Sequence, residues 1–309
     1  MEDAYEWHII GDRSIPLPVI IYSKAKGFNI FMSNKLQHGH TVYHGFKLET
    51  YGENSGKIVE TIENENFQLP LLDISITKNV TAIFFSLLLL LWIFTAIAKS
   101  YKKNKGKAPK GVQSFFEPII LFVRDEIAKP AIGEKNHERF MPFLLSVFFF
   151  IWFNNMLGLV PIFPGGANVT GNIAVTMILA IFTFLMTAFS GNKNYWQHIF
   201  NAPGVPWWLK LPVPLMPIIE IVGMLTKPFV LMIRLFANIS AGHIIVLGFY
   251  CLIFIFGDMN PTFGYAVSPL SIIFTIFMTF LELLVAFIQA YVFTLLSAIY
   301  FGMATEEHH

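Results

Sequence analysis

The stretch PIIEIVGMLTKPFVLMIRLFANISAGHIIVLGFYCLIFIF, residues 217–256, decides the fold class of this chain. A second apolar stretch covers residues 268–303, and Gly-Asp-Met-Asn-Pro at 257–261 separates the two. At 1.5 Å per residue, about 38 helical residues are about 57 Å long, whereas the hydrocarbon core of a bilayer is about 30 Å thick. The usual helix tilt of about 20° does not absorb this excess. A break at Gly242 or Gly248 is the alternative, but neither has a proline beside it, so we expect a strongly tilted helix pair.

The composition of the whole chain agrees with a membrane protein. Of the 309 residues, 55% are hydrophobic and 13% are charged, and the mean hydropathy is +0.59. Soluble domains carry about 25% charged residues. The formal net charge of +1 excludes a strongly basic nucleic-acid binder. Because Cys251 is the single cysteine, an intrachain disulfide is excluded as well.

Three further apolar segments, 80–98, 140–162 and 173–189, precede the long pair. The sequence therefore predicts an all-α integral membrane protein with about five membrane helices. Residues 99–110 contain six lysines and no acid, and a short basic loop beside a helix end belongs on the cytoplasmic side. Counting five spans from this loop places the N-terminus outside and the C-terminus inside, in the cell inner (plasma) membrane.

The remaining segments are expected to lie at or outside the membrane surface. Residues 1–75 form a polar extracytoplasmic leader with short strand-like stretches, and the membrane domain covers 76–309. The leader lacks a signal-peptide pattern, so either it crosses the membrane by another route or a signal has been removed. Residues 113–129 are typical of an amphipathic helix in the interface, although an ordinary linker helix fits equally well. Residues 190–214 are expected to form a loop with interfacial aromatics.

Ionisable side chains within the spans are confined to the two long segments, and an arginine at the bilayer centre costs roughly 2.5 to 17 kcal/mol. They are Glu220, Lys227, Arg234, His243 and Glu282, accompanied by the amides Asn238 and Gln289. Polar groups concentrated in two helices of five indicate an ion path.

The spacing of these groups along the first long segment places them on two opposite faces of a helix. Glu220, Lys227 and Arg234 are seven residues apart and Asn238 is four beyond Arg234, so all four lie near one face. His243 is nine residues past Arg234, about 180° round the helix. One face thus presents a permanent cation and the other a titratable group. That arrangement suits two aqueous routes kept apart by Arg234.

Simpler interpretations compete for several of these residues. Lys227 fits a lysine that reaches to the interface, and Glu220 near a helix N-terminus suits the helix dipole. Arg234 needs only an acid such as Glu220 or Glu282 to form a structural ion pair. Outside the long pair, Asn154 and Asn155 are expected to hydrogen-bond between helices. The histidines of the leader, His8, His38, His40 and His44, are expected to be solvated rather than to bind a metal.

The segment KPFVLMIRLFANISAGH, residues 227–243, closely resembles the arginine helix of ATP synthase subunit a. Residues 283–304 resemble the last helix of that family, and residues 153–161 and 167–170 resemble its middle hairpin. Four motifs in the family order cover about residues 80–309. The resemblance implies a non-catalytic subunit that moves protons through two offset half-channels to and from the rotating c-ring of a rotary F-type ATP synthase.

The resemblance also implies a role for each matched residue. Arg234 matches the essential arginine that faces the ring carboxylate, and Asn238 and Gln289 match polar neighbours that help to seat it. Glu220 matches an acid lining the cytoplasmic-side route. A further pair, His243 and Glu282, occupies positions where members carry either His and Glu or the reverse.

One residue departs from the pattern of some members, because Asn168 stands where some bacterial members have an acid. An amide does not titrate, so Asn168 is expected at most to order water. The implied partners are the c-ring, the subunit b stator, the F1 sector indirectly and membrane lipid, with no cofactor and no nucleic acid. A secondary ion-coupled transporter is the alternative, but it would usually show inverted repeats. An intramembrane enzyme is less favoured, since no Ser/His/Asp set or His-Glu-x-x-His pattern occurs in the spans.

Overall fold

The computed structural model describes residues 4–10, 13–24, 26–50, 54–62, 66–70, 72–103, 109–160, 165–200 and 215–306. The chain divides into two compact units. The first comprises Met1–Ser86 together with Val160–Val169, and the second comprises Leu87–Leu159 together with Thr170–His309. The first unit contains the strands and the second contains nearly all of the helices.

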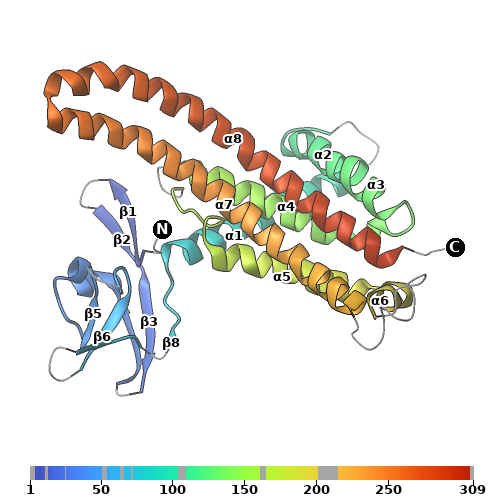
Figure 1. Cartoon of the computed structure of the whole chain (residues 1–309), viewed down its shortest axis with the longest axis horizontal. Helices are drawn as coiled ribbons and strands as arrows, with labels where there is room; N and C mark the ends of the chain where they lie inside the picture. Colours follow the sequence, from blue (N-terminus) through green and yellow to red (C-terminus); the bar gives the residue numbers. More distant parts are fainter. Residues whose placement is uncertain are drawn as a thin grey trace. The chain divides into compact units, whose positions relative to one another are not determined.

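Five helices of the described chain are long and apolar enough to cross a membrane, which confirms the expected number of spans. They are α1 (Lys78–Lys103), α4 (His137–Leu159), α5 (Ile173–Ser190), α7 (Leu215–Met259) and α8 (Pro261–Thr305), drawn in Figure 1. The second expected span ends at Leu159 rather than at 162, and residues 161–164 of its turn lie outside the described residues.

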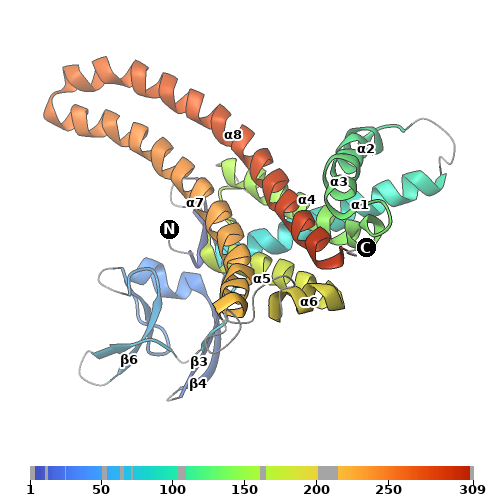
Figure 2. The same cartoon turned by 45° about the vertical axis from the view of Figure 1, so that its right-hand side comes forward.

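Helices α7 and α8 are unbroken and 45 residues long each, so no break occurs at Gly242 or Gly248. They run antiparallel and side by side (Figure 1, Figure 2). Residues 257–261 were expected to separate the two helices, but α7 continues to Met259 and α8 begins at Pro261, so only Asn260 lies between them. The side-chain oxygen of Asn260 accepts a hydrogen bond from the backbone N–H of Thr262 at 3.0 Å and caps α8. Pro261 at the first helical position needs no N–H partner.

Aromatic side chains dominate the core between α4 and α8. Phe140 stacks on Phe301 at 4.8 Å between ring centroids, and both side chains are fully buried. Phe148 and Phe149 continue this core toward the middle of α4. Nine tenths or more of each ring is out of solvent, so packing rather than helix propensity fixes how α4 lies on α8.

The expected amphipathic segment is helical from α2 (Val112–Phe122) through a π-helical turn, η2 (Val123–Ala128), to α3 (Lys129–Ile132). Arg124 and Lys129 both bind the carboxylate of Asp125, with N–O distances of 2.9 and 2.7 Å. The Arg124 hydrogen bond and then the Lys129 hydrogen bond hold the pKa of Asp125 well below its usual range. These charges lie together in the helical turn η2 and the start of α3.

The expected loop at 190–214 is wrong for its first part, where residues form helix α6 (Lys193–Phe200). The polar residues of this short segment concealed one apolar side, on which Trp196 stacks on Phe200 and Ile199 is buried. The other residues of the expected loop, 201–214, lie outside the described residues.

The N-terminal region is a folded β unit rather than a loose solvated leader. Its strands are β1 (Glu6–Ile10), β2 (Arg13–Pro16), β3 (Pro18–Ser23), β4 (Gly27–Met32), β5 (Phe46–Leu48), β6 (Ile58–Ile62), β7 (Asn66–Gln68) and β8 (Leu72–Asp73). They pair antiparallel as three sheets, β1-β2, β4-β3-β8 and β5-β6-β7.

A small apolar core holds this β unit together. Val19 and Ile21 of β3, Phe46 of β5 and Ile58 of β6 are almost completely buried in it, together with Leu36 of the 3-10 helix η1 (Ser33–Gly39). Each strand is only two to six residues long, which is why no sustained periodicity marked the strands in the sequence. One leader histidine, His38, lies 3.4 Å from the carboxylate of Glu6. The described residues contain no group of three His, Cys, Asp or Glu side chains that could hold a metal.

Candidate functional site

Arg234 lies on an exposed face of α7, near the middle of the helix. Ala237, Ala241 and Gly248 follow it on the same face at helical spacing and are exposed too. A Cβ atom added at Gly248 would meet nothing within 4 Å. Small side chains at Ala237 and Ala241 therefore lie beside the guanidinium group, and small side chains allow another helix to approach closely.

A pocket of about 260 Å³ lies on the C-terminal side of Arg234, between α4, α7 and α8. It is lined by Asn155, Leu159, Asn238, Ile239, Gly242, His243, Glu282, Val285 and Ala286. The fold thus brings His243 and Glu282 together from two different helices. The Oε1 atom of Glu282 is buried and has no hydrogen-bond partner within the described chain. We call this the His–Glu pocket.

Two neighbours position the groups of the His–Glu pocket. A Cβ atom at Gly242 would come within 2.5 Å of Glu282 Oε1, so the absence of a side chain there makes room for the carboxylate. The side-chain amide of Asn155 donates to the carbonyl of Ala286 at 3.2 Å and accepts from the Thr170 hydroxyl at 2.5 Å. This interhelical bond confirms the expectation for Asn155.

The same expectation is wrong for Asn154. Its side-chain amide donates to the carbonyl of Phe150 one turn earlier in α4 itself, at 2.7 Å. Its neighbour in the sequence, Asn155, faces about 100° further round the helix and therefore reaches α8 instead.

A wider pocket of about 810 Å³ lies on the N-terminal side of Arg234, between α6, α7 and α8. It is lined by Tyr195, Ile199, Glu220, Gly223, Met224, Lys227, Met303 and Glu306. We call it the Glu220 pocket. Burial and the nearby charge of Glu220 both raise the pKa of Tyr195 on α6. Two acids and a lysine make this pocket strongly polar for a protein interior.

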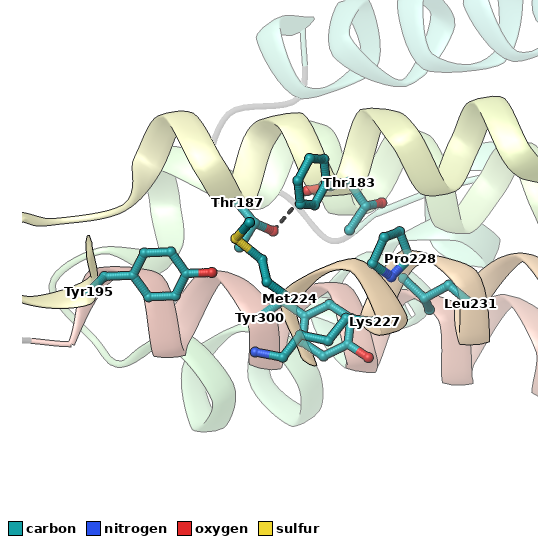
Figure 3. A pocket seen from close by; sticks show the side chains of 9 residues that line it. Thr183, Thr187, Tyr195, Met224, Lys227, Pro228, Leu231 and Tyr300 are labelled. Carbon is teal, nitrogen blue, oxygen red and sulfur yellow. Dashed lines mark hydrogen bonds between the residues drawn. The ribbon is translucent and has the colours of Figure 1, made fainter. Parts of the chain in front are cut away.

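A smaller cavity adjoins the Glu220 pocket and shares Tyr195, Met224 and Lys227 with it (Figure 3). In this view the Lys227 side chain lies beside the ring of Tyr300, with its Nζ atom 5.4 Å from the ring centroid. A cation over an aromatic face is stabilised by the quadrupole of the ring. The Lys227 side chain is thus half-buried against Tyr300 of α8.

The predicted site residues fall into three groups along α7 and α8. Glu220 lines one pocket, His243 and Glu282 line the other, and Arg234 stands between them, seven residues beyond Lys227 and nine before His243. These separations correspond to about 10 and 14 Å along the helix axis. Asn238 is exposed and also lines the His–Glu pocket, so it borders both the pocket and the Arg234 face.

Two predicted residues lie elsewhere. Gln289 is only 6% exposed and belongs to the buried side of α8, away from the linings of both pockets. Asn168 belongs to the other compact unit. Sequence reasoning missed Gly242 and Tyr195 as site residues. A glycine in the middle of an apolar helix was a usable signal for Gly242, whereas nothing local marked Tyr195.

The fold and this site define a multi-pass membrane protein with two polar pockets along its two long helices. A family model described as ATP synthase A chain matches residues 80–302, and a model for a domain of unknown function matches residues 1–76. The chain therefore belongs to the ATP synthase subunit a family. As a member it is a non-catalytic subunit of the membrane F0 sector, the proton channel coupled to rotation of the c-ring.

Curated relatives support the assignment over most of the chain. ATP synthase subunit a 2 of Chlorobaculum tepidum is 45% identical over 266 residues, which is 84% of this chain and 69% of the relative. ATP synthase subunit a of Chloroherpeton thalassium is 43% identical, covering 76% of this chain and 69% of the relative. The Myxococcus xanthus subunit is 42% identical, covering 77% and 75%.

Proposed function

We propose that protons cross this subunit through two offset half-channels, one at each pocket along α7, and that Arg234 keeps them apart. The observation that carries the proposal is the order of the groups on α7. The exposed Arg234 lies between a pocket with Glu220 and a pocket with His243 and Glu282. A permanent cation between two polar pockets repels protons that would otherwise pass directly from one to the other.

In this proposal the His–Glu pocket is the entry route from outside the cell. His243 and Glu282 supply groups that can exchange protons near neutral pH. The unpartnered Oε1 atom of Glu282 faces a pocket roomy enough for water, which supports a relay rather than a structural ion pair. Asn238 lies at the border of this pocket, and protons leave the pocket there toward the Arg234 face.

The Arg234 face is the surface that meets the ring. Arg234 never deprotonates in practice, and it pairs transiently with the ionised ring carboxylate, which favours release of the proton. Ala237 and Ala241 beside it leave room for a ring helix. Asn238 helps to seat the carboxylate, and Gln289 supports this arrangement from the buried side of α8.

The Glu220 pocket is the exit route to the cytoplasm in this proposal. Its width and its two acids suit a hydrated vestibule. The orientation that follows has the N-terminus outside, the C-terminus inside and the chain in the cell inner membrane. The ring and the stator subunit b are the direct partners, and the F1 sector is an indirect one. Each proton crossing yields about 2.3 kcal/mol per 100 mV, so several crossings must be combined for each ATP.

The test is replacement of Arg234 in the assembled enzyme. Arg234→Ala should leave the subunit inserted, abolish proton-driven ATP synthesis and let protons leak passively. Arg234→Lys should also fail, because an ammonium group lacks the planar guanidinium fork and loses its proton more readily when desolvated. Proton uptake and ATP synthesis are measured in membrane vesicles, with assembly checked by copurification of the ring.

Arg139→Ala is the matched control, since Arg139 is an exposed arginine at the start of α4 and lines neither pocket. It should synthesise ATP normally. Substantial coupled synthesis by a fully assembled Arg234→Ala enzyme would contradict the mechanism.

A further inference from the structure

The sheet β4-β3-β8 of the N-terminal unit is apolar on both sides. One side carries Val19, Ile21 and Phe31 and forms the small core. The opposite side, which we call the outer face, presents six exposed apolar residues: Tyr22, Phe28, Ile30, Met32, Leu72 and Ile74. Phe28, Ile30 and Ile74 are 62%, 63% and 61% exposed, so nothing in the described chain covers this face.

The strand register shows that these residues are neighbours. Tyr22 pairs with Phe28 on one side and with Leu72 on the other, and side chains of directly paired residues point to the same face. Ile30 pairs with Ile20, and Ile74 donates its backbone N–H to the same Ile20 at 2.9 Å. The six side chains therefore form one continuous apolar surface.

This surface is unusual for a sheet of this kind. An antiparallel sheet with one side on a core is ordinarily polar on its other side. Here the acid nearest to the outer face, Asp73, points to the opposite side, where its carboxylate accepts a hydrogen bond from the Tyr5 hydroxyl at 2.5 Å. A continuous exposed apolar patch marks a site of contact with another protein or with a membrane.

Backbone hydrogen bonds hold the start of the membrane helix α1, and the residues that lead into it, against the N-terminal unit. The backbone N–H of Ile76 donates to the carbonyl of Pro18 at 3.0 Å, and that of Lys78 donates to the carbonyl of Ala4 at 2.8 Å. Four residues lead from Ile74 to Lys78, and they span at most about 14 Å. No more than about 14 Å therefore separates the edge of the outer face from the start of a membrane span.

The residues at the ends of the β3–β4 hairpin fit a lipid surface. Lys24 follows β3 and Lys35 follows β4, and both are exposed. Lysines beside an apolar surface attract anionic lipid headgroups. Tyr22 has the apolar ring and polar tip that favour the membrane interface.

We infer that the outer face rests on the lipid bilayer beside α1 and anchors the N-terminal unit in the headgroup region. The sheet stays at the interface and does not enter the hydrocarbon, because its edge strands carry backbone groups that need water. The inference is independent of the proton path and of the side of the membrane on which the unit lies. It assigns a lipid contact to the part of the chain that precedes the membrane domain.

The test places an environment-sensitive fluorophore on the outer face of the assembled complex. In a Cys251→Ser background, Ile30→Cys is labelled with nitrobenzoxadiazole, and Lys57→Cys, exposed before β6 in another sheet, is the matched control. Vesicles contain phosphatidylethanolamine and phosphatidylglycerol, with a nitroxide on the headgroup, near the top of the acyl chain or at its end. Aqueous iodide is the second quencher.

The label at position 30 should be quenched several-fold more by headgroup and upper-chain nitroxides than by the chain-end nitroxide, and it should resist iodide. The label at position 57 should behave in the opposite way. Phe28→Cys, also on the outer face, should repeat the result for position 30, and unchanged ATP synthesis shows that the labelled complexes are intact. Equal iodide quenching at positions 30 and 57 would overturn the inference. Protection from iodide without nitroxide quenching would overturn it too, because a protein partner would then cover the face.

Discussion

The position of the Glu282 carboxylate shows how a glycine on a neighbouring helix, Gly242, can shape a site. The Oε1 atom of Glu282 is buried without a partner in the described chain and lies 2.5 Å from where a Cβ atom of residue 242 would be. Gly242 and His243 are adjacent on α7, so the helix that presents the imidazole also makes room for the carboxylate. The position of Glu282 thus depends on a glycine that does not itself titrate.

Gly242→Ala should therefore slow proton conduction although it removes no ionisable group. The added methyl would come within 2.5 Å of Glu282 Oε1, so the flexible carboxylate must turn away from its place in the pocket. We expect roughly a tenfold slower proton uptake in vesicles, which corresponds to about 1.4 kcal/mol in the barrier. Gly257→Ala near the end of α7 is the control, since its Cβ would meet nothing within 4 Å. Equal rates for the two variants would argue against a role for the Glu282 position.

At the scale of elements, α8 is held where α3 crosses it. Gly302 lies so close to the carbonyl of Ala131 that a Cβ atom at 302 would overlap it. The contact is with backbone, which cannot rotate away as a side chain can. The amphipathic segment α2-η2-α3 is thereby fastened to the C-terminal part of α8, next to the Phe140–Phe301 stack.

Gly302→Ala should lower the stability of the subunit by about 1–3 kcal/mol, because α3 must move away from α8. Gly248→Ala makes the same chemical change at an open position of α7, where alanine favours the helix by about 1 kcal/mol over glycine. Thermal unfolding of the purified subunit in detergent measures both variants. A lowered midpoint for Gly302→Ala with an unchanged or raised midpoint for Gly248→Ala is expected, and the reverse order would contradict this packing.

At the scale of the whole molecule, orientation depends on charge outside the spans. Six lysines between 99 and 110 lie at the end of α1 and just after it, whereas Glu306 after α8 adds no basic charge at the C-terminal end. The orientation therefore rests mainly on one loop. Four spans, α4, α5, α7 and α8, connect this loop to the C-terminus, and an even number of crossings is what the proposal needs to have both on the same side.

Thiol labelling checks that orientation. In a Cys251→Ser background, Lys103→Cys at the end of α1 should resist an impermeant maleimide added to intact cells and react in inverted vesicles. Lys57→Cys in the N-terminal unit should show the opposite pattern. Labelling of position 103 from outside would reverse the proposed topology and, with it, the assignment of entry and exit routes.

Features that depend on neighbours along the chain could be predicted from the sequence. Five long apolar runs predicted five helices. The spacing of seven residues predicted that Glu220, Lys227 and Arg234 share one side of α7. Helical hydrogen bonds join residues four apart, so both properties are local. Family resemblance supplied the pairing of His243 with Glu282.

Only the tertiary structure decided which side chains from different elements meet. Helix spacing does not encode how far one helix is shifted along another, so the fit of Glu282 against Gly242 and the burial of Gln289 were not predictable. Strand pairing likewise joins distant segments, as where Tyr22 of β3 pairs with Leu72 of β8. The sequence therefore showed a polar leader, and only strand pairing revealed a sheet with an apolar outer face.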